Sequence, residues 1–295
     1  MKINANGSSI AAQESSTLTN NALKNSLEKL SSGLKINKAS DDASGLAIAD
    51  KLRTQVTSVN QGIANGNSAI AMLQIADKSM AEQSQILDTV KAKLIQANTD
   101  TTSTAGRTAI AKDITKLLDQ LNNIAKQTNY NGTTLLQATA TNGAAKTTLS
   151  FQIGESTRDM IETATIQANI TGYSLDTLKG EVSLGAAVSA GATAGTTNVF
   201  TRAMATAGQA AVDKAITTLN GYRGDIGSTQ NQIESAVRNL MTQSTNIKNA
   251  ESVLRDVDYA EESANFNKLN IISQAGSYAI SQSNAVSQNV LRLLQ

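Results

Sequence analysis

The sequence lacks three residue types that carry much of protein chemistry and chain geometry. It contains no cysteine, no histidine and no proline in 295 residues. Without cysteine there is no disulfide and no thiolate nucleophile. Without histidine the commonest general base and transition-metal ligand is missing. Without proline nothing interrupts a helical hydrogen-bond ladder. These absences disfavour an enzyme, predict neither cofactor nor metal, and favour long helices.

Strong charge of one sign and long apolar runs are also missing. The 25 Lys and Arg residues nearly balance the 24 Asp and Glu residues, so there is no electrostatic footprint for nucleic acid or an anionic membrane. No apolar run approaches the roughly 20 residues that cross a bilayer. The first residues lack the apolar segment of a cleaved signal peptide. We therefore expect no nucleic-acid partner, no membrane partner and no cleaved signal peptide.

Two series of apolar residues at seven-residue spacing dominate the remaining sequence. The first series is Leu52, Val59, Gly66, Leu73, Met80, Leu87 and Leu94. The second series is Val212, Leu219, Ile226, Ile233, Leu240, Ile247 and Leu254. A third stripe, with 4-3-4-3 spacing, is Ile110, Ile114, Leu117, Leu121 and Ile124. Such spacing is typical of long helices with coiled-coil-like faces, and the equal length of the first two allows them to pack side by side.

The segment between the long helices has a different pattern. Residues 130–133 read YNGT, which is a turn signal. Apolar or β-branched residues then alternate with others at 149–153 and 161–165, which predicts a small β-hairpin near 147–170. Residues 183–202 are rich in Ala, Gly, Ser and Thr. We interpret this stretch as a short outer loop that is too small for a separate outer domain.

The two ends of the chain resemble each other in composition. Each is polar, apart from one apolar stripe at helical spacing, and short helices of this kind are marginal alone. The stripes are Leu23, Leu27, Leu30 and Leu34 near the start, and Ile272, Ala275, Ala279, Val286, Val290 and Leu293 near the end. We infer that these helices need each other, or neighbouring subunits, to stay folded. The predicted fold is mainly α, a long antiparallel helical rod with paired terminal helices and a small β-hairpin.

Five short segments occur in the same order as motifs of a known family. Residues 30–37 read LSSGLKIN and residues 41–49 read DDASGLAIA. Residues 130–136 read YNGTTLL, residues 255–262 read RDVDYAEE and residues 288–295 read QNVLRLLQ. These segments resemble motifs of bacterial flagellins, over about the first 140 and last 90 residues. The resemblance is to a short form without large outer domains.

The resemblance implies a layout and a function. Residues 1–40 plus 256–295 would form a coiled-coil inner-tube domain, and residues 41–182 plus 203–255 the surrounding rod. The chain would polymerise into an extracellular flagellar filament for motility. The implied partners are other copies of the chain, the flagellar export apparatus with its chaperone, and the filament cap and hook-junction proteins. The polymerisation interface is then predicted at Leu23, Leu27, Leu30, Leu34, Ile272, Ala279, Val286, Val290 and Leu293.

Paired carboxylates are the nearest approach to a catalytic motif. They occur at Asp41–Asp42 and Glu261–Glu262. A catalytic pair requires a cleft and a shifted pKa, whereas solvated pairs are common where helices begin. We expect a structural role, with Ser40 or Asp41 capping the helix that follows.

One family site can be compared residue by residue. Flagellins sensed by Toll-like receptor five usually have a segment similar to L-x-R-x-R-E-L-A-x-Q late in the first rod helix. The matching residues 87–96 of this chain read LDTVKAKLIQ. Thr89 replaces the first Arg, Lys91 the second, Ala92 the Glu and Lys93 the Leu. Loss of an Arg contact and of an apolar anchor can abolish recognition. We predict poor receptor binding at this stretch, and we assign Asp113 to the same site.

Two other functions remain possible at this level. A hook–filament junction protein would share the terminal helices but join the filament rather than build it. A soluble helical effector or adhesin is a rival of a different class. Polymerisation of the purified chain alone would separate the filament subunit from both.

Overall fold

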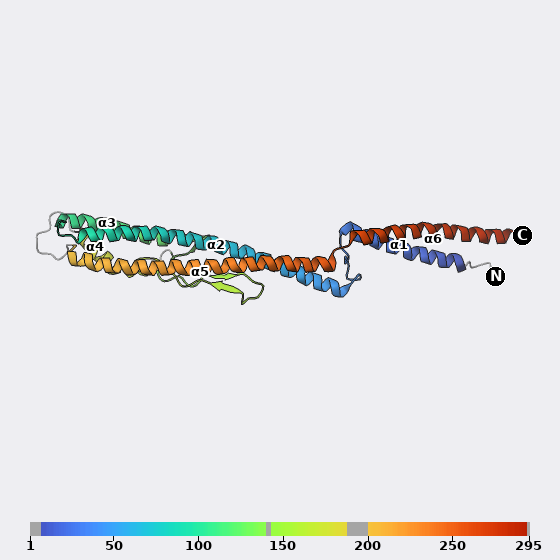
Figure 1. The fold of residues 1–295 in the computed structure, drawn as a ribbon, viewed down its shortest axis with the longest axis horizontal. Helices are drawn as coiled ribbons and strands as arrows, with labels where there is room; N and C mark the ends of the chain where they lie inside the picture. Colours follow the sequence, from blue (N-terminus) through green and yellow to red (C-terminus); the bar gives the residue numbers. More distant parts are fainter. Residues whose placement is uncertain (1–6, 140–142, 188–199, 294–295) are drawn as a thin grey trace. The chain divides into compact units, whose positions relative to one another are not determined.

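The computed structural model describes residues 7–139, 143–187 and 200–293. Within these ranges the helices are α1 (Gly7–Ser32), α2 (Ala43–Ala97), α3 (Thr104–Gln127), α4 (Asp176–Ala187), α5 (Arg202–Arg255) and α6 (Tyr259–Leu293). Contacts divide the chain into two compact units. We call residues 1–57 with 243–295 the terminal unit, and residues 58–242 the rod unit. The helical content and the antiparallel long helices in Figure 1 confirm the predicted fold class.

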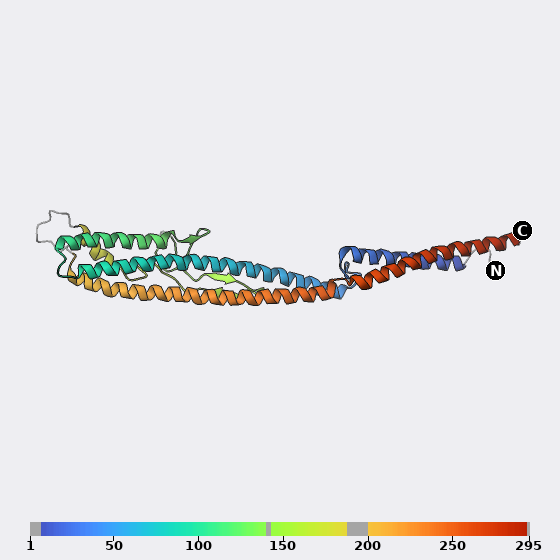
Figure 2. The same ribbon diagram turned by 45° about the horizontal axis from the view of Figure 1, so that its top comes forward.

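The rod unit is built on antiparallel packing of α2 and α5, which lie side by side in both views (Figures 1 and 2). Asp77 pairs with Arg223 at 2.8 Å, and Lys91, further along α2, pairs with Asp213, earlier in α5, at 2.6 Å. The predicted seam residues Leu73, Met80, Leu87, Leu94, Val212, Leu219, Ile226 and Ile233 are all buried. Helix α3 adds a third layer of apolar residues and packs against α4.

Two small antiparallel hairpins lie between α3 and α4. Strands β1 (Asn129–Tyr130) and β2 (Thr133–Thr134) are joined by the turn that the sequence predicts. Strands β3 (Ser150–Gln152) and β4 (Met160–Glu162) pair with Phe151 opposite Ile161, which confirms the hairpin predicted near 147–170. Phe151 and Ile161 pack on the edge of the core.

A buried polar cluster joins the segment after the hairpins to α2 and α3. The Gln83 side chain of α2 is fully buried, and its Nε2 donates to the carbonyl oxygens of Leu121, at 3.2 Å, and Ala168, at 2.8 Å. The Tyr173 hydroxyl donates to Gln83 Oε1 at 2.8 Å. Burial raises the pKa of Tyr173 far above its ordinary value. The cluster thus has the partners that buried polar atoms need.

Helices α1 and α6 of the terminal unit pack together as an antiparallel pair. Ser9, early in α1, bonds Asn284, late in α6, at 2.9 Å. Further along α1, Asn20 accepts from the Ser273 hydroxyl at 2.9 Å, and Ser26 donates to Glu262. The pairing of the terminal helices that the sequence predicts is therefore present within one chain.

The connection between α1 and α2 differs from the sequence prediction at Leu34. Helix α1 ends at Ser32, and Gly33 has a φ of 74°, a conformation that favours glycine. A Cβ at Gly33 would also lie 2.8 Å from the Tyr259 hydroxyl oxygen. Leu34 then pairs with Asp256 in an antiparallel bridge. The predicted helical stripe therefore stops at Leu30, because the chain turns at Gly33.

The cap of α2 also differs from the prediction. Asp42 Oδ1 accepts from the Gly45 backbone N–H at 2.9 Å, so Asp42 rather than Ser40 or Asp41 caps the helix. Asp41 Oδ2 instead accepts from the backbone N–H groups of Asn37, at 3.1 Å, and Lys38, at 3.0 Å. These bonds hold the pKa of Asp41 below its ordinary value. Both carboxylates have structural partners, as expected.

Residues 183–187 differ from the predicted outer loop, because α4 continues through Ala187. Leu175, Leu178 and Val182 are buried and anchor this helix on the rod unit. The composition of residues 183–187 does not indicate a helix, because the apolar residues that anchor α4 lie before residue 183. Residues 188–199 of the predicted loop lie outside the described residues, whereas at its end Phe200 is fully buried and Arg202 begins α5.

Candidate functional site

The contact face between α1 and α6 is lined mainly by small and polar side chains. On each helix, one series of its buried and half-buried positions recurs at alternating spacings of three and four. On α1 they are Ser9, Ala12, Ser16, Thr19, Leu23, Ser26 and Leu30. On α6 they are Glu262, Phe266, Leu269, Ser273, Gly276, Ile280 and Ser283. This is coiled-coil spacing, but most positions lack the bulky apolar residues that usually stabilise such a face.

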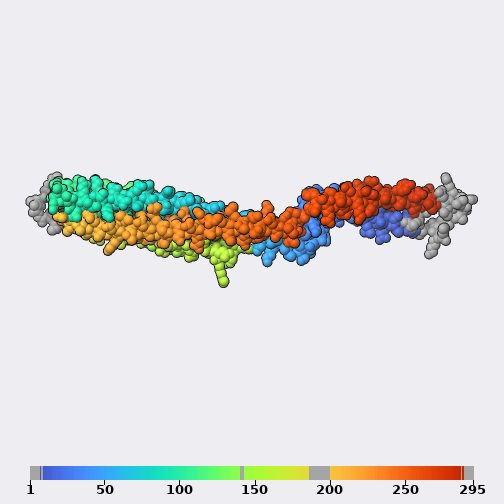
Figure 3. Space-filling model, viewed as in Figure 1, coloured from blue at the N-terminus to red at the C-terminus, as the bar shows by residue number. Residues whose placement is uncertain are grey.

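Several other large apolar side chains of the same helices are exposed. On α6, Tyr278 is 73% exposed and Ile271 is 67% exposed, and Ile272 and Val286 are exposed as well. On α1, Ile10, Leu18 and Leu27 are exposed. The space-filling view shows α6, in red, with an uncovered surface along most of its length (Figure 3). Exposed apolar side chains in this number make the terminal helices a candidate protein interaction site.

The structure separates the residues predicted for the polymerisation interface into distinct groups. Leu23 and Leu30 are half-buried between α1 and α6, whereas Leu27 is 55% exposed. Leu34 lies beyond α1, as described above. The α6 residues Ile272, Ala279 and Val286 form an exposed stripe at seven-residue spacing. The side chains of Val290 and Leu293 lie outside the described residues.

Sequence reasoning missed the residues that hold the two terminal helices together. Ser26, Ser273 and Gly276 are small or polar, so a search for apolar stripes passes over them. They belong to a series with its own 4-3 spacing, and this spacing could have identified them. On α6, Ser273 and Gly276 each lie one residue after a member of the apolar stripe that contains Ile272 and Ala279. Since both series have helical periodicity, the sequence does not show which of them faces α1.

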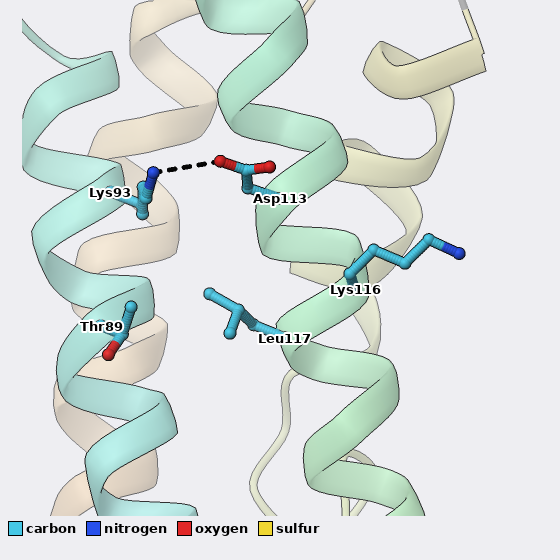
Figure 4. Close-up of a pocket in the computed structure, with 5 residues that line it drawn as sticks. All are labelled: Thr89, Lys93, Asp113, Lys116 and Leu117. Atoms are coloured by element: carbon cyan, nitrogen blue, oxygen red, sulfur yellow. Dashed lines mark hydrogen bonds and ion pairs between the residues drawn. The ribbon is translucent and has the colours of Figure 1, made fainter.

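The stretch compared with the receptor-binding motif lies beside a shallow groove between α2 and α3. Thr89, Lys93, Asp113, Lys116 and Leu117 line a space of about 330 Å³ (Figure 4). Lys93 Nζ lies 3.0 Å from Asp113 Oδ2, and the Thr89 hydroxyl donates to its own helix at the carbonyl of Gln85. Lys91 points elsewhere and pairs with Asp213 of α5. Ala92 is exposed.

The described residues offer little for catalysis or for membrane insertion. They contain no group of three or more metal-ligating side chains that could hold an ion. Within the same ranges, no helix has both the length and the apolar character needed to cross a membrane. The candidate functional surface in the described residues is the set of exposed apolar side chains on the terminal helices.

Comparison with known proteins gives the family. Residues 3–141 match the bacterial flagellin N-terminal helical region, and residues 209–294 match the bacterial flagellin C-terminal helical region. The chain is 34% identical to flagellin from Bacillus subtilis (strain 168) and 32% identical to the flagellar filament 30.7 kDa core protein of Treponema maltophilum. Each alignment covers 100% of both chains.

A solved structure shares the fold. The chain is similar to a putative flagellar hook-associated protein from Vibrio parahaemolyticus, with a TM-score of 0.55 and 13% identity. That similarity covers 73% of this chain and 99% of the other.

These findings identify the class as a non-enzymatic structural protein of the bacterial flagellum. The chain belongs to the bacterial flagellin family. It is a filament subunit that assembles with copies of itself into the extracellular flagellar filament.

Proposed function

We propose that subunits assemble through the exposed apolar side chains of α1 and α6. The observation that carries this proposal is the contrast between the two faces of the helix pair. The face within the chain is mainly small and polar, whereas Leu27, Ile272 and Tyr278 point to solvent. Burial of apolar surface contributes roughly 25 cal/mol per Å², so covering the outer face with neighbouring copies would stabilise both the helices and the polymer.

The proposed layout follows from this interface. The terminal helices, predicted as residues 1–40 and 256–295, would form the inner tube of the filament, and the rod would surround it without a separate outer domain. The compact units have boundaries at 57/58 and 242/243, so the terminal unit also includes the first turns of α2 and the last turns of α5. The export apparatus and its chaperone, the cap and the hook-junction proteins are proposed partners on family resemblance alone.

Charge substitution at the outer face tests the proposed interface. Leu27→Asp should prevent the purified chain from forming filaments, because it would place an unpaired carboxylate in a packed interface. Met241→Asp is the matched control, since Met241 on α5 of the rod unit is 56% exposed, close to the 55% of Leu27. Electron microscopy after salt-induced polymerisation measures the result. Normal filaments from Leu27→Asp, with helical content unchanged, would show that the interface lies elsewhere.

We also propose that Toll-like receptor five binds this protein poorly. The support is local: Lys91 and Lys93 are each held by an ion pair, and Ala92 offers neither charge nor a large apolar anchor. The double substitution Thr89→Arg and Ala92→Glu restores two residue types of the family pattern. It should raise the response of a receptor reporter cell above that of the unaltered chain. A strong response to the unaltered chain would refute the proposal.

A further inference from the structure

The turn between β1 and β2 holds an asparagine–glycine pair in an unusually open setting. Asn131 has a φ of 48° and Gly132 a φ of 80°, the positive values that a two-residue hairpin turn favours. Residues 131–133 are all exposed. Nothing lies within 4 Å of a Cβ placed on Gly132. In the described parts of the chain, neither the Asn131 side chain nor the Gly132 backbone N–H has a hydrogen-bond partner.

We propose that Asn131 is a site of spontaneous deamidation. The Gly132 backbone nitrogen attacks Asn131 Cγ, and the bond between Cγ and Nδ2 breaks. The proton from the glycine N–H leaves with the amide nitrogen as ammonia, and a cyclic imide remains. Water then adds to either carbonyl of the ring and opens it to aspartate or isoaspartate. No oxidation or reduction occurs, and water is the only co-reactant.

The same dipeptide occurs at two other places within the described residues, in settings that oppose this reaction, while Asn6 and Asn142 of two further pairs lie outside them. Asn220–Gly221 lies inside α5 and is also exposed, so it differs from the turn in backbone structure rather than in access to water. Helical geometry engages the Gly221 N–H in the backbone ladder. Asn65–Gly66 lies inside α2, where Asn65 Nδ2 donates to the Gln152 carbonyl at 3.0 Å and Gly66 is buried beneath Val237.

The position of the turn determines what the modification changes. Conversion adds a negative charge, and isoaspartate also adds a carbon to the backbone between Tyr130 and Gly132. That insertion is incompatible with the pairing of Tyr130 and Thr133 across the turn. Leu135 and Leu136 follow immediately and are buried in the rod core. The hairpin would therefore loosen next to the core as the protein ages.

Peptide mapping by mass spectrometry tests the proposal on the full native chain, incubated at mildly alkaline pH. The mapping reports Asn131, Asn220 and Asn65 separately, and it resolves aspartate from isoaspartate by retention time. We expect at least about tenfold more conversion at Asn131 than at Asn220, because the helix must first open locally at Gly221. In urea the two conversions should agree within about threefold, since the unfolded chain keeps only fluctuating structure.

The controls distinguish the turn from general lability of the dipeptide. Asn131→Gln should suppress conversion at position 131 and leave the Asn220 conversion unchanged. Equal conversion at Asn131 and Asn220 in the native chain would overturn the proposal. An intact Asn131 in the native chain, with ready conversion in urea, would overturn it as well, because the turn would then protect its asparagine.

Discussion

The rod unit and the terminal unit use the same helical spacing but bury different kinds of residue. In the rod, the positions between helices are filled by residues such as Met80, Leu87 and Leu94, all fully buried. In the terminal unit the equivalent positions include Ser16, Thr19 and Ser273. Among its described residues, only Ile36 and Ala49 are buried apolar residues. The two units therefore share the spacing of their contacts, and side-chain size decides how much each contact stabilises.

This difference has a consequence for stability. Because the rod has a large buried apolar core within one chain, we expect it to stay folded as a monomer. The terminal helices depend on polar contacts such as the bond between Asn20 and Ser273, and individual hydrogen bonds contribute little net free energy. We expect substitutions to have larger effects in the rod of the isolated subunit, and larger effects on assembly in the terminal unit.

The largest expected loss of stability comes from the rod core. Leu87→Ala should lower the free energy of unfolding of the rod by about 2–5 kcal/mol, because a fully buried leucine leaves a cavity. Leu23→Ala, at a half-buried position between α1 and α6, should cost less than about 1.5 kcal/mol. Denaturant unfolding of the monomer, followed by circular dichroism, measures both. Equal losses would contradict the contrast between the two units.

The buried polar cluster of the rod should give the next largest effect. Gln83→Ala removes the partner of the Tyr173 hydroxyl and of the Leu121 and Ala168 carbonyls. Unpaired buried groups cost about 1–3 kcal/mol each, so thermal unfolding should occur at a clearly lower temperature. Gln85→Ala, on the exposed face of the same helix, is the control and should change stability by less than about 0.5 kcal/mol. Similar losses in both variants would indicate that the cluster is not stabilising.

A smaller effect of opposite sign is expected between the terminal helices. A Cβ at Gly276 would lie 4.0 Å from Ser16 Cβ, which is ordinary van der Waals contact. Gly276→Ala should therefore stabilise α6 by about 0.5–1 kcal/mol through helix propensity. Gly227→Ala is the matched control in α5, where a Cβ would meet nothing within 4 Å. Backbone amide hydrogen exchange measures the change, and faster exchange in α6 of Gly276→Ala would show that the contact is already close-packed.

The smallest expected effect is a pH dependence confined to the loop before α2. Because the folded pKa of Asp41 is lowered, its carboxylate stabilises this loop above the unfolded pKa. That contribution is lost as the pH falls through the lower folded pKa. The backbone amide signals of Asn37 and Lys38 in nuclear magnetic resonance spectra should shift across this acid range. Asp41→Asn should remove the shift, and its persistence would assign the effect to another group.

The sequence predicted the elements whose signals are local. Seven-residue spacing located the long helices of the rod, and alternation located the hairpin of β3 and β4. The dipeptide Asn131–Gly132 located a turn, because few residues tolerate its positive φ values. The family motifs located the two matching terminal regions. In each case the pattern depends on neighbouring residues or on a fixed repeat, so it can be recognised without knowledge of the contacts.

Other features depended on contacts between distant residues. Leu34 continues the leucine spacing, but the chain turns at Gly33, which packs beside Tyr259. Residues 183–187 have a loop-like composition, yet α4 is anchored on the rod by Leu178 and Val182. Asp42 rather than Asp41 caps α2, because Asp41 is engaged by the backbone of the preceding loop. Local preference alone did not distinguish these outcomes.

The sequence by itself determined that this protein is rich in long helices and contains neither cysteine nor histidine. It also determined which positions recur on each helix face. Only the tertiary structure decided which of two neighbouring faces of α6 meets α1, because Ile272 and Ser273 belong to series of the same period. The structure places Ser273 and Gly276 toward α1 and leaves Ile271, Ile272 and Tyr278 exposed. The exposed apolar side chains are the surface that we propose for contact with neighbouring subunits.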